Sequence, residues 1–396
     1  MTAPSKDWLF LGSLGGLGIL GGQGFSRFSF GLLFPSMGVS LVGTTSNASL
    51  LAALYAAAYF VGVAALIFVT RRVAPLRLLV SGVVVSTIGL LSIGLARSES
   101  VVIFGLVVAG LGAAFTYVPA LSFVGAALKG ASRDKATGVA SAGIGAGIIV
   151  ARVLAFVFRA ESTSSGWRSV WMSEAAIGAV ASAVIILYAF RTPSSVEDRG
   201  VPIRTTLRMP HWLAIGMSYL CFGVAYSIYS NLAVKAWELG GLSGFWAANS
   251  LLLVAPFQMS GGILLPWLGR KIGAPGAIGA SYLLLTLAVA EVGLRAQDIV
   301  LSFTSAVCVG LVSAGIPAQV VLAVRKRLEG QGIARDATTT VFGVITLMYA
   351  IGGFVGLLGA AHLSKTHGVL TSTFVVAALL ALVGGLCALR GTPGKH

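Results

Sequence analysis

The chain alternates between long apolar stretches and short polar connections. Each stretch holds about 20 or more mostly apolar residues, the length that an α-helix needs to cross a membrane. Charged residues or clusters of proline and glycine bound the stretches. They cover residues 8–37, 47–70, 76–96, 101–128, 136–158, 167–190, 211–234, 244–268, 273–294, 299–324, 337–362 and 369–389. The pattern predicts an all-α membrane protein with twelve transmembrane helices.

One connection is longer and more polar than the others. Residues 191–210 are rich in proline, serine and charged side chains, and they separate six apolar stretches from six others. Such a segment is typical of a linker between structural units. We predict a six-helix bundle over 1–190, a linker over 191–210 and a second six-helix bundle over 211–396.

The composition excludes soluble enzymes and secreted disulfide scaffolds. Apolar residues make up 57% of the chain and charged residues 10%, whereas soluble domains hold about 25% charged residues. So few charges cannot cover the surface of soluble domains. Cys221, Cys308 and Cys387 lie inside apolar stretches without the spacing of a metal site, so we expect buried thiols. We expect no disulfide, metal or other cofactor.

The net charge of +15 at first suggests a nucleic-acid partner, but the location of the charge gives another explanation. Most of the 27 lysines and arginines fall in connections on the side that holds both termini, and only Arg27 and Arg152 fall within spans. Cytoplasmic loops carry such an excess. We therefore predict a multi-pass membrane protein, with both termini and the linker in the cytoplasm and no nucleic-acid partner.

The two halves carry matching segments in the same order. Segment 71–75 matches 270–275, segment 132–134 matches 334–336, and Gly24 matches Gly223. Parallel repeats of this kind predict two bundles related by a pseudo-two-fold axis along the membrane normal. Such bundles face each other across a central cavity, and their rocking exposes that cavity to each side in turn.

Residues after the eighth stretch resemble a loop signature of the major facilitator superfamily. That signature, G-x-x-x-D-R-x-G-R-R, is echoed by Gly262, Gly269, Arg270 and Lys271, with Pro266 in place of the acid. The resemblance covers essentially the whole chain. It implies a transporter with two six-helix bundles.

Three further segments support this resemblance. Residues 110–114 are similar to the G-x-G-A-A end of a fourth-helix motif of the superfamily. Residues 24–37 are similar to the G-x-G-R-F-x-Y-x-x-L-L-P-x-M first helix of its bacterial YbfB-like branch, and residues 166–171 to the G-W-R-x-x-W entry of that branch's sixth helix. The first-helix segment departs from the pattern at Ser26, Phe30 and Phe34. The branch indicates the fold far more than a substrate. It also implies that the protein lies in the bacterial cytoplasmic (inner) membrane.

Arg27 lies deep within the first stretch, where an arginine costs about 2.5–3.5 kcal/mol on insertion scales. It has two interpretations, a structural arginine bonded to neighbouring helices or an anion site. Gln23, Phe30 and Phe34 share its helical face. A guanidinium binds a carboxylate through two parallel hydrogen bonds, which favours the anion site.

The repeat aligns Arg27 with Tyr226 and Phe30 with Tyr229 in the seventh stretch. Phe222 lies on the same helical face as Tyr226. Phenols combine a hydroxyl donor with an apolar ring, which suits a small organic anion. We predict that these three residues line the cavity opposite Arg27.

Arg152 and Glu174 flank the turn near position 163 at equal distances, so the two antiparallel helices place them at equal depth. They can form a structural ion pair. Alternatively, Glu174 can carry a proton if the substrate competes for Arg152, because it is the only acid well inside a stretch.

These observations favour a monomeric secondary transporter, surrounded by lipid, for a small organic anion such as a monocarboxylate. Proton symport is left open. The alternative is a multidrug or metabolite efflux antiporter in which Arg27 is structural. A non-transporting membrane receptor of the same fold also stays open, whereas a membrane enzyme is not expected because no nucleophile and base pair can be named.

Overall fold

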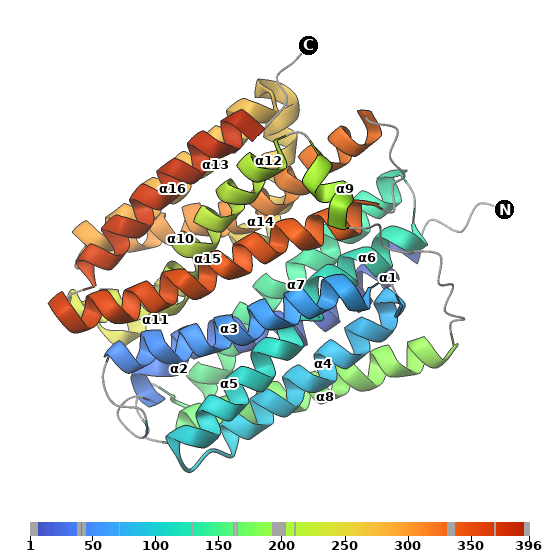
Figure 1. Cartoon of the computed structure of the whole chain (residues 1–396). Coiled ribbons are helices and arrows are strands. Elements are labelled where there is room, and N and C mark those ends of the chain that lie inside the picture. The colour runs from blue at the N-terminus through green and yellow to red at the C-terminus, as the bar shows by residue number, and fades with distance from the viewer. Residues whose placement is uncertain are drawn as a thin grey trace.

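The computed structural model describes residues 7–37, 41, 45–70, 72–128, 130–160, 163, 165–191, 203–209, 211–330, 337–367 and 370–391. Within these residues all regular structure is helical (Figure 1). The first half contains α1 (Asp7–Ile19), η1 (Leu20–Gly24), α2 (Phe25–Met37), α3 (Thr45–Val69), α4 (Pro75–Gly94), α5 (Glu99–Ala114), α6 (Tyr117–Ala127), α7 (Gly130–Val157) and α8 (Gly166–Arg191). The second half contains α9 (Ile203–Arg208), α10 (Trp212–Leu239), α11 (Gly244–Leu252), α12 (Val254–Ile272), α13 (Ala274–Leu294), α14 (Ile299–Gly330), α15 (Ala337–His367) and α16 (Thr371–Gly391).

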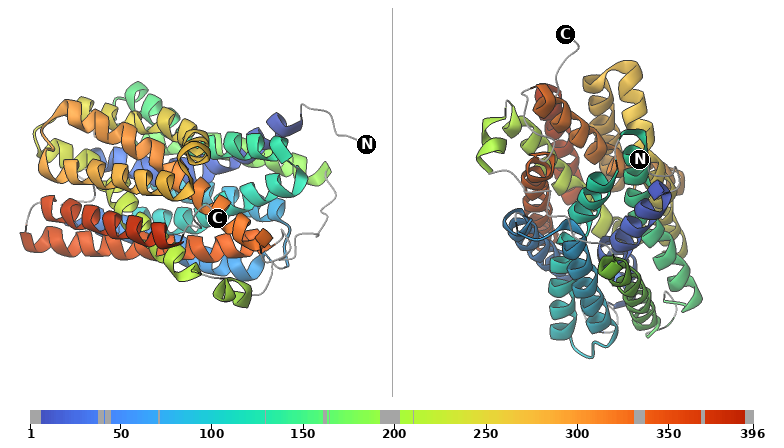
Figure 2. Two further views of the ribbon diagram at one scale, coloured as in Figure 1. Left: turned by 90° about the horizontal axis from the view of Figure 1, so that it is seen from above. Right: turned by 90° about the vertical axis from the view of Figure 1, so that its right-hand side faces the viewer.

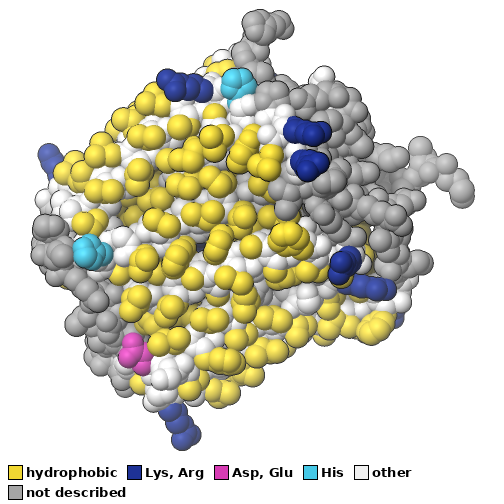
Figure 3. Space-filling model, viewed as in Figure 1, with side chains coloured by type: hydrophobic (Ala, Val, Ile, Leu, Met, Phe, Trp, Pro, Cys, Tyr) yellow, Lys and Arg dark blue, Asp and Glu magenta, His cyan; other side chains and the backbone are white. Residues whose placement is uncertain are grey.

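The helices have the lengths and surfaces of membrane spans. Among the described residues, 11 helical segments are long and apolar enough to cross a membrane, two of them formed by the pairs α5–α6 and α11–α12. Hydrophobic side chains cover most of the face in Figure 3, and lysines and arginines lie at its margins. The predicted class, an all-α membrane protein, is confirmed.

The first predicted span is not one regular α-helix, which corrects the expectation for residues 8–37. A π-helical turn, η1, separates α1 from α2. Gly22 allows this turn to pack closely, because a Cβ there would lie 2.1 Å from Thr116 Cγ2. The Gly22 carbonyl accepts bonds from the hydroxyls of Ser26 and Ser86, at 2.5 and 3.0 Å. Turns of this type occur frequently at functional sites.

The two halves repeat the same helix packing. Matching close contacts are Gly62 with Leu111 and Gly261 with Leu311, then Gly94 with Arg168 and Gly293 with Thr371. In Figure 2 the first half (blue to green) and the second half (yellow to red) occupy different parts of the molecule. The common packing is the arrangement expected of a six-helix repeat. Only part of 191–210, including α9, is described, so the position of the division stays a prediction.

The halves meet along three helix pairs, α3 with α15, α7 with α12 and α2 with α10. We call the side where α1 begins and α16 ends the terminal side, and the opposite one the far side (Figure 1). Toward the far side, a Cβ on Gly31 would lie 2.5 Å from the Ser230 carbonyl. Toward the terminal side, a Cβ on Gly138 or Gly343 would meet only isoleucine side chains, at 3.7 and 3.6 Å. The backbones of the two halves therefore approach more closely at Gly31 than at these two terminal-side positions.

Candidate functional site

Arg27 is buried near the start of α2, directly after the π-helical turn. Its Nη2 donates a hydrogen bond to Ser227 Oγ at 3.0 Å. Its Cζ lies 4.7 Å from the ring centre of Tyr226 and 5.3 Å from that of Tyr349, within the range of a cation–π interaction. All three partners belong to the second half, so Arg27 links the two halves.

The tyrosines around Arg27 are held by an aromatic stack in the second half. Phe222 stacks on Tyr226 with ring centres 5.3 Å apart and planes 10° apart. It also contacts Tyr219 and Tyr349, each with ring centres 5.5 Å away. These rings come from α10 and α15. Their mutual packing fixes the aromatic surface that faces the guanidinium.

Two buried glutamines, one from each half, donate to tyrosine hydroxyls. Gln23 Nε2 lies 3.5 Å from the hydroxyl of Tyr59, and Gln258 Nε2 lies 3.5 Å from that of Tyr226. Both glutamines leave Oε1 without a partner among the described residues, and Arg27 leaves Nε unpartnered. Buried polar atoms normally have partners. These three atoms can therefore bind a polar ligand.

Arg27 forms no ion pair with any described carboxylate, and its contacts described above are all with neutral groups. Buried charges are normally paired with an opposite charge. The site is thus suited to an anion that enters from solution.

Glu174 lies on α8 and is fully buried. Its Oε1 accepts a hydrogen bond from Ser29 Oγ at 2.5 Å, and its Oε2 has no partner among the described residues. Ser29 is two residues from Arg27 on α2, so the two side chains point to roughly opposite faces of that helix. Glu174 therefore contacts α2 on the face opposite to Arg27.

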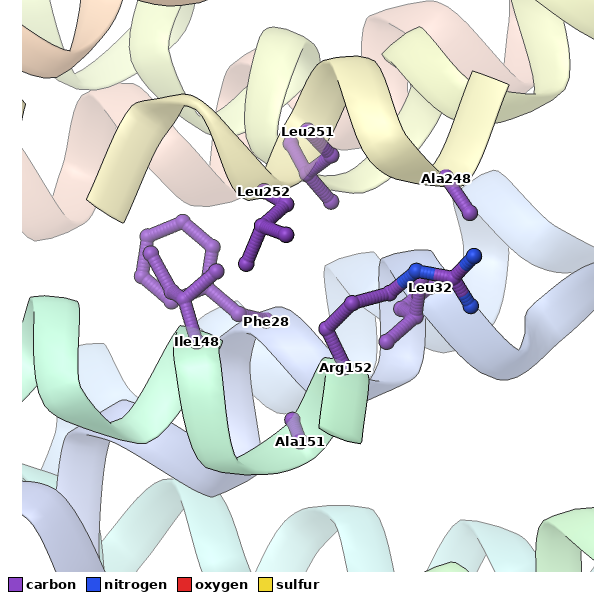
Figure 4. Close-up of a pocket in the computed structure, with 8 residues that line it drawn as sticks. All are labelled: Phe28, Leu32, Ile148, Ala151, Arg152, Ala248, Leu251 and Leu252. Atoms are coloured by element: carbon purple, nitrogen blue, oxygen red, sulfur yellow. The ribbon is translucent and has the colours of Figure 1, made fainter. Parts of the chain in front are cut away.

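Arg152 reaches from α7 toward α11 of the second half (Figure 4). Its Nε donates to Asn249 Oδ1 at 3.1 Å, and its Cζ lies 5.9 Å from the ring centre of Phe245. The side chain borders a cavity of about 10 Å³, close to the smallest space that holds one water molecule. The predicted ion pair with Glu174 is therefore not the contact that the structure shows. Equal depth of Arg152 and Glu174 in the membrane does not determine how α7 and α8 are rotated about their axes, so the two side chains need not face each other.

Comparison with protein families agrees with this architecture. The family model described as "Uncharacterised MFS-type transporter YbfB" matches residues 19–389. The chain belongs to this family of the major facilitator superfamily. It is therefore a multi-pass membrane protein of a secondary transporter family, and the resemblance predicted from its motifs is confirmed.

Solved structures of other transporters share the fold. One is described as a major facilitator superfamily transporter, FucP, in the outward conformation, with 15% identity, a TM-score of 0.67 and coverage of 98% of this chain and 99% of that one. Another is a variant of the E. coli fucose:proton symporter, FucP, with 16% identity, a TM-score of 0.67 and coverage of 98% of each chain. No curated protein matches the chain.

The predicted site residues of this YbfB-like transporter do not all lie together. Arg27, Phe222 and Tyr226 lie together, and Gln23 lies four residues before Arg27, in η1. Phe30 and Phe34 contact each other, with ring centres 5.6 Å apart, on α2. Tyr229 lies apart from Arg27, because its hydroxyl accepts from Ser305 Oγ at 3.1 Å within the second half. A binding role for any of them stays a prediction.

Sequence reasoning missed Tyr349, Tyr59 and Ser227 as neighbours of this site. The two tyrosines are mid-span aromatics of α15 and α3, and Ser227 adjoins a predicted residue. The sequence shows that these residues lie within apolar stretches, but it does not show which helix faces meet. The described residues contain no group of three or more His, Cys, Asp and Glu side chains that could hold a metal ion.

Proposed function

We propose that this transporter moves a small organic anion, such as a monocarboxylate, across the membrane by alternating access. The observation that supports this proposal is Arg27, a buried guanidinium that meets only neutral groups among the described residues. A substrate carboxylate would compensate its charge and accept two parallel hydrogen bonds. The unpartnered Nε of Arg27 is one donor of that pair.

The surrounding residues add selectivity. The unpartnered Oε1 atoms of Gln23 and Gln258 are acceptors, so they suit a substrate with a hydroxyl or amino hydrogen beside its carboxylate. The stacked rings of Phe222, Tyr226 and Tyr349 offer apolar faces to its carbon skeleton. A substrate that displaces Ser227 from Arg27 breaks one link between the halves, so binding and rocking are coupled.

Transport by proteoliposomes tests the role of Arg27. We expect Arg27→Gln to lower uptake of radiolabelled lactate or pyruvate by roughly tenfold to hundredfold, because hydrogen bonds to a charged group contribute about 1.5–3 kcal/mol. Arg27→Lys keeps the charge and loses the planar fork, so we expect an intermediate rate. Arg97→Gln, at an exposed far-side position, is the matched control. Uptake by Arg27→Gln at the rate of the unmodified protein would rule out this site.

Thermal stabilisation of the purified protein across a metabolite panel identifies the substrate. A ligand at 100 times its Kd stabilises the folded state by about 2.7 kcal/mol. We expect carboxylates to stabilise the protein and Arg27→Gln to abolish the effect. Stabilisation by uncharged or cationic amphiphiles instead would favour the alternative, an efflux antiporter whose aromatic stack binds apolar compounds.

A further inference from the structure

Glu174 is a buried acid that the proposed anion site does not use. It is fully buried on α8, and one carboxylate oxygen lacks a partner among the described residues. Trp171, one turn earlier on the same helix, also leaves its Nε1 unpartnered. A donor and an acceptor are thus left open on the side of α8 that bonds α2.

No cation among the described residues compensates Glu174. The helical segments packed on α8 are α1, η1, α2, α4 and α7. Their charged residues within the spans are Arg27, which contacts the second half, and Arg152, whose Nε bonds Asn249. On α8 itself, Arg168 bonds a backbone carbonyl of the α4–α5 connection. The others stand on the terminal side of these segments, and they are Asp7, Arg77, Arg133, Asp134, Lys135 and Arg191. An ionised carboxylate buried without a cation is strongly unfavourable.

A metal ion does not suit the position. The oxygen-bearing side chains that meet there are Glu174 and Ser29, whereas Ca²⁺ takes about six to eight oxygen ligands. A proton needs only the open carboxylate oxygen. The acid is also not required by the repeated fold, because the contacts that match Arg168 with Thr371 place Ala377 at the equivalent position.

We propose that Glu174 is the proton-binding site of this transporter. Its hydrogen bond with Ser29 of α2 couples its protonation to anion binding at Arg27 on the same helix. This inference rests on the proposed transport of an anion. When Glu174 is protonated, Arg27 is left as an uncompensated positive charge and attracts the substrate. When Glu174 is ionised, its charge acts on Arg27 across one helix diameter and weakens anion binding about tenfold.

The π-helical turn gives this coupling a mechanical route. Regular α-helical bonding is interrupted between α1 and α2, so α2 can rotate while α1 stays packed on α7. Glu174 and Arg27 lie on opposite sides of α2, and Ser29 of α2 donates a hydrogen bond to Glu174. Glu174 lies about two turns from the far-side end of α8, so its proton exchanges with the far side.

Proteoliposomes with an imposed proton gradient test the coupling. We expect Glu174→Gln, which mimics the protonated acid, to keep lactate and pyruvate exchange and to lose acceleration by the gradient. Glu291→Gln, a matched change on α13 of the second half, should keep the acceleration. Protein-free liposomes correct for passive entry of the acids. Gradient-driven uptake by Glu174→Gln at the unmodified rate would overturn the inference.

Infrared titration tests the proton site without transport. We expect a pH-dependent carboxyl C=O band that is absent in Glu174→Gln and persists in Ser29→Ala. In Ser29→Ala the affinity for lactate or pyruvate should depend less on pH. Absence of the band would overturn the inference and leave anion transport standing. The band together with failure to bind or move any carboxylate would overturn the proposed function instead.

Discussion

Tyr349 and Tyr226 hold the Arg27 guanidinium between rings of the second half, 5.3 and 4.7 Å from its Cζ. A desolvated cation–π pair contributes about 2 kcal/mol. We expect Tyr349→Leu to destabilise the purified protein, whereas Tyr349→Phe keeps the ring and most of the stability. Apparent melting temperatures in detergent measure both effects.

A double-mutant cycle separates this interaction from simple loss of packing. In an Arg27→Gln background, Tyr349→Leu should cost about 0.5–2 kcal/mol less than in the unmodified protein. An equal cost in both backgrounds would show that Tyr349 contributes packing alone.

For single residues, the sequence predicted depth along a helix better than it predicted contact partners. Arg27 and Tyr226 were paired because the repeat aligns them, and they are in contact. Glu174 and Arg152 were paired by depth, yet each bonds another helix. Depth along a helix follows from residue counting, whereas rotation about its axis depends on packing that one sequence does not contain.

The contact of α2 with α10 shows how one glycine allows the two halves to approach closely on the far side. Gly31 lets these helices touch, since a Cβ there would lie 2.5 Å from the Ser230 carbonyl. Overpacking at a tight contact costs about 1–3 kcal/mol. We therefore expect Gly31→Ala to shift the population toward states in which the far side is open, by roughly fivefold to a hundredfold.

Cysteine accessibility measures this shift. With the native cysteines replaced, the labelling rate of Ser227→Cys from the far side should rise in the Gly31→Ala background. Gly359→Ala on α15 is the matched control, because nothing lies within 4 Å of a Cβ at that position. An equal rise in both backgrounds would show that the Gly31 contact does not hold the far side closed.

Element boundaries were predictable where composition changes and not where backbone geometry changes. Residues 8–37 are continuously apolar and glycine-rich, so the sequence predicted one span. The π-helical turn depends on the fit of Gly22 against Thr116 and on two hydroxyls bonding the Gly22 carbonyl. Those partners come from α2, α4 and the α5–α6 connection, far apart along the chain.

The whole molecule was the most predictable level. Length, apolar fraction and matching segments sufficed for an all-α membrane fold with repeated halves, because membrane spans must satisfy their backbone bonds internally. The contacts of α7 with the second half were not predicted. Arg152 of α7 donates a hydrogen bond to Asn249 of α11, and the pattern of apolar stretches does not predict this polar contact.

Orientation in the membrane is the remaining prediction for the whole molecule. Most of the basic residues that the structure describes stand on the terminal side, so we expect that side to face the cytoplasm. Leu207→Cys on α9 and Gln297→Cys between α13 and α14 are neutral positions on opposite sides, outside the membrane spans. In a background without Cys221, Cys308 and Cys387, a membrane-impermeant maleimide should label only Gln297→Cys in intact cells.

Permeabilised cells serve as the control, because both cysteines should then be labelled. Neither substitution changes the number of basic residues, so the charge distribution that is being tested is preserved. Labelling of Leu207→Cys alone in intact cells would place the termini outside. That result would reverse the side from which a proton would reach Glu174 under our proposal, because the far-side end of α8 would then face the cytoplasm.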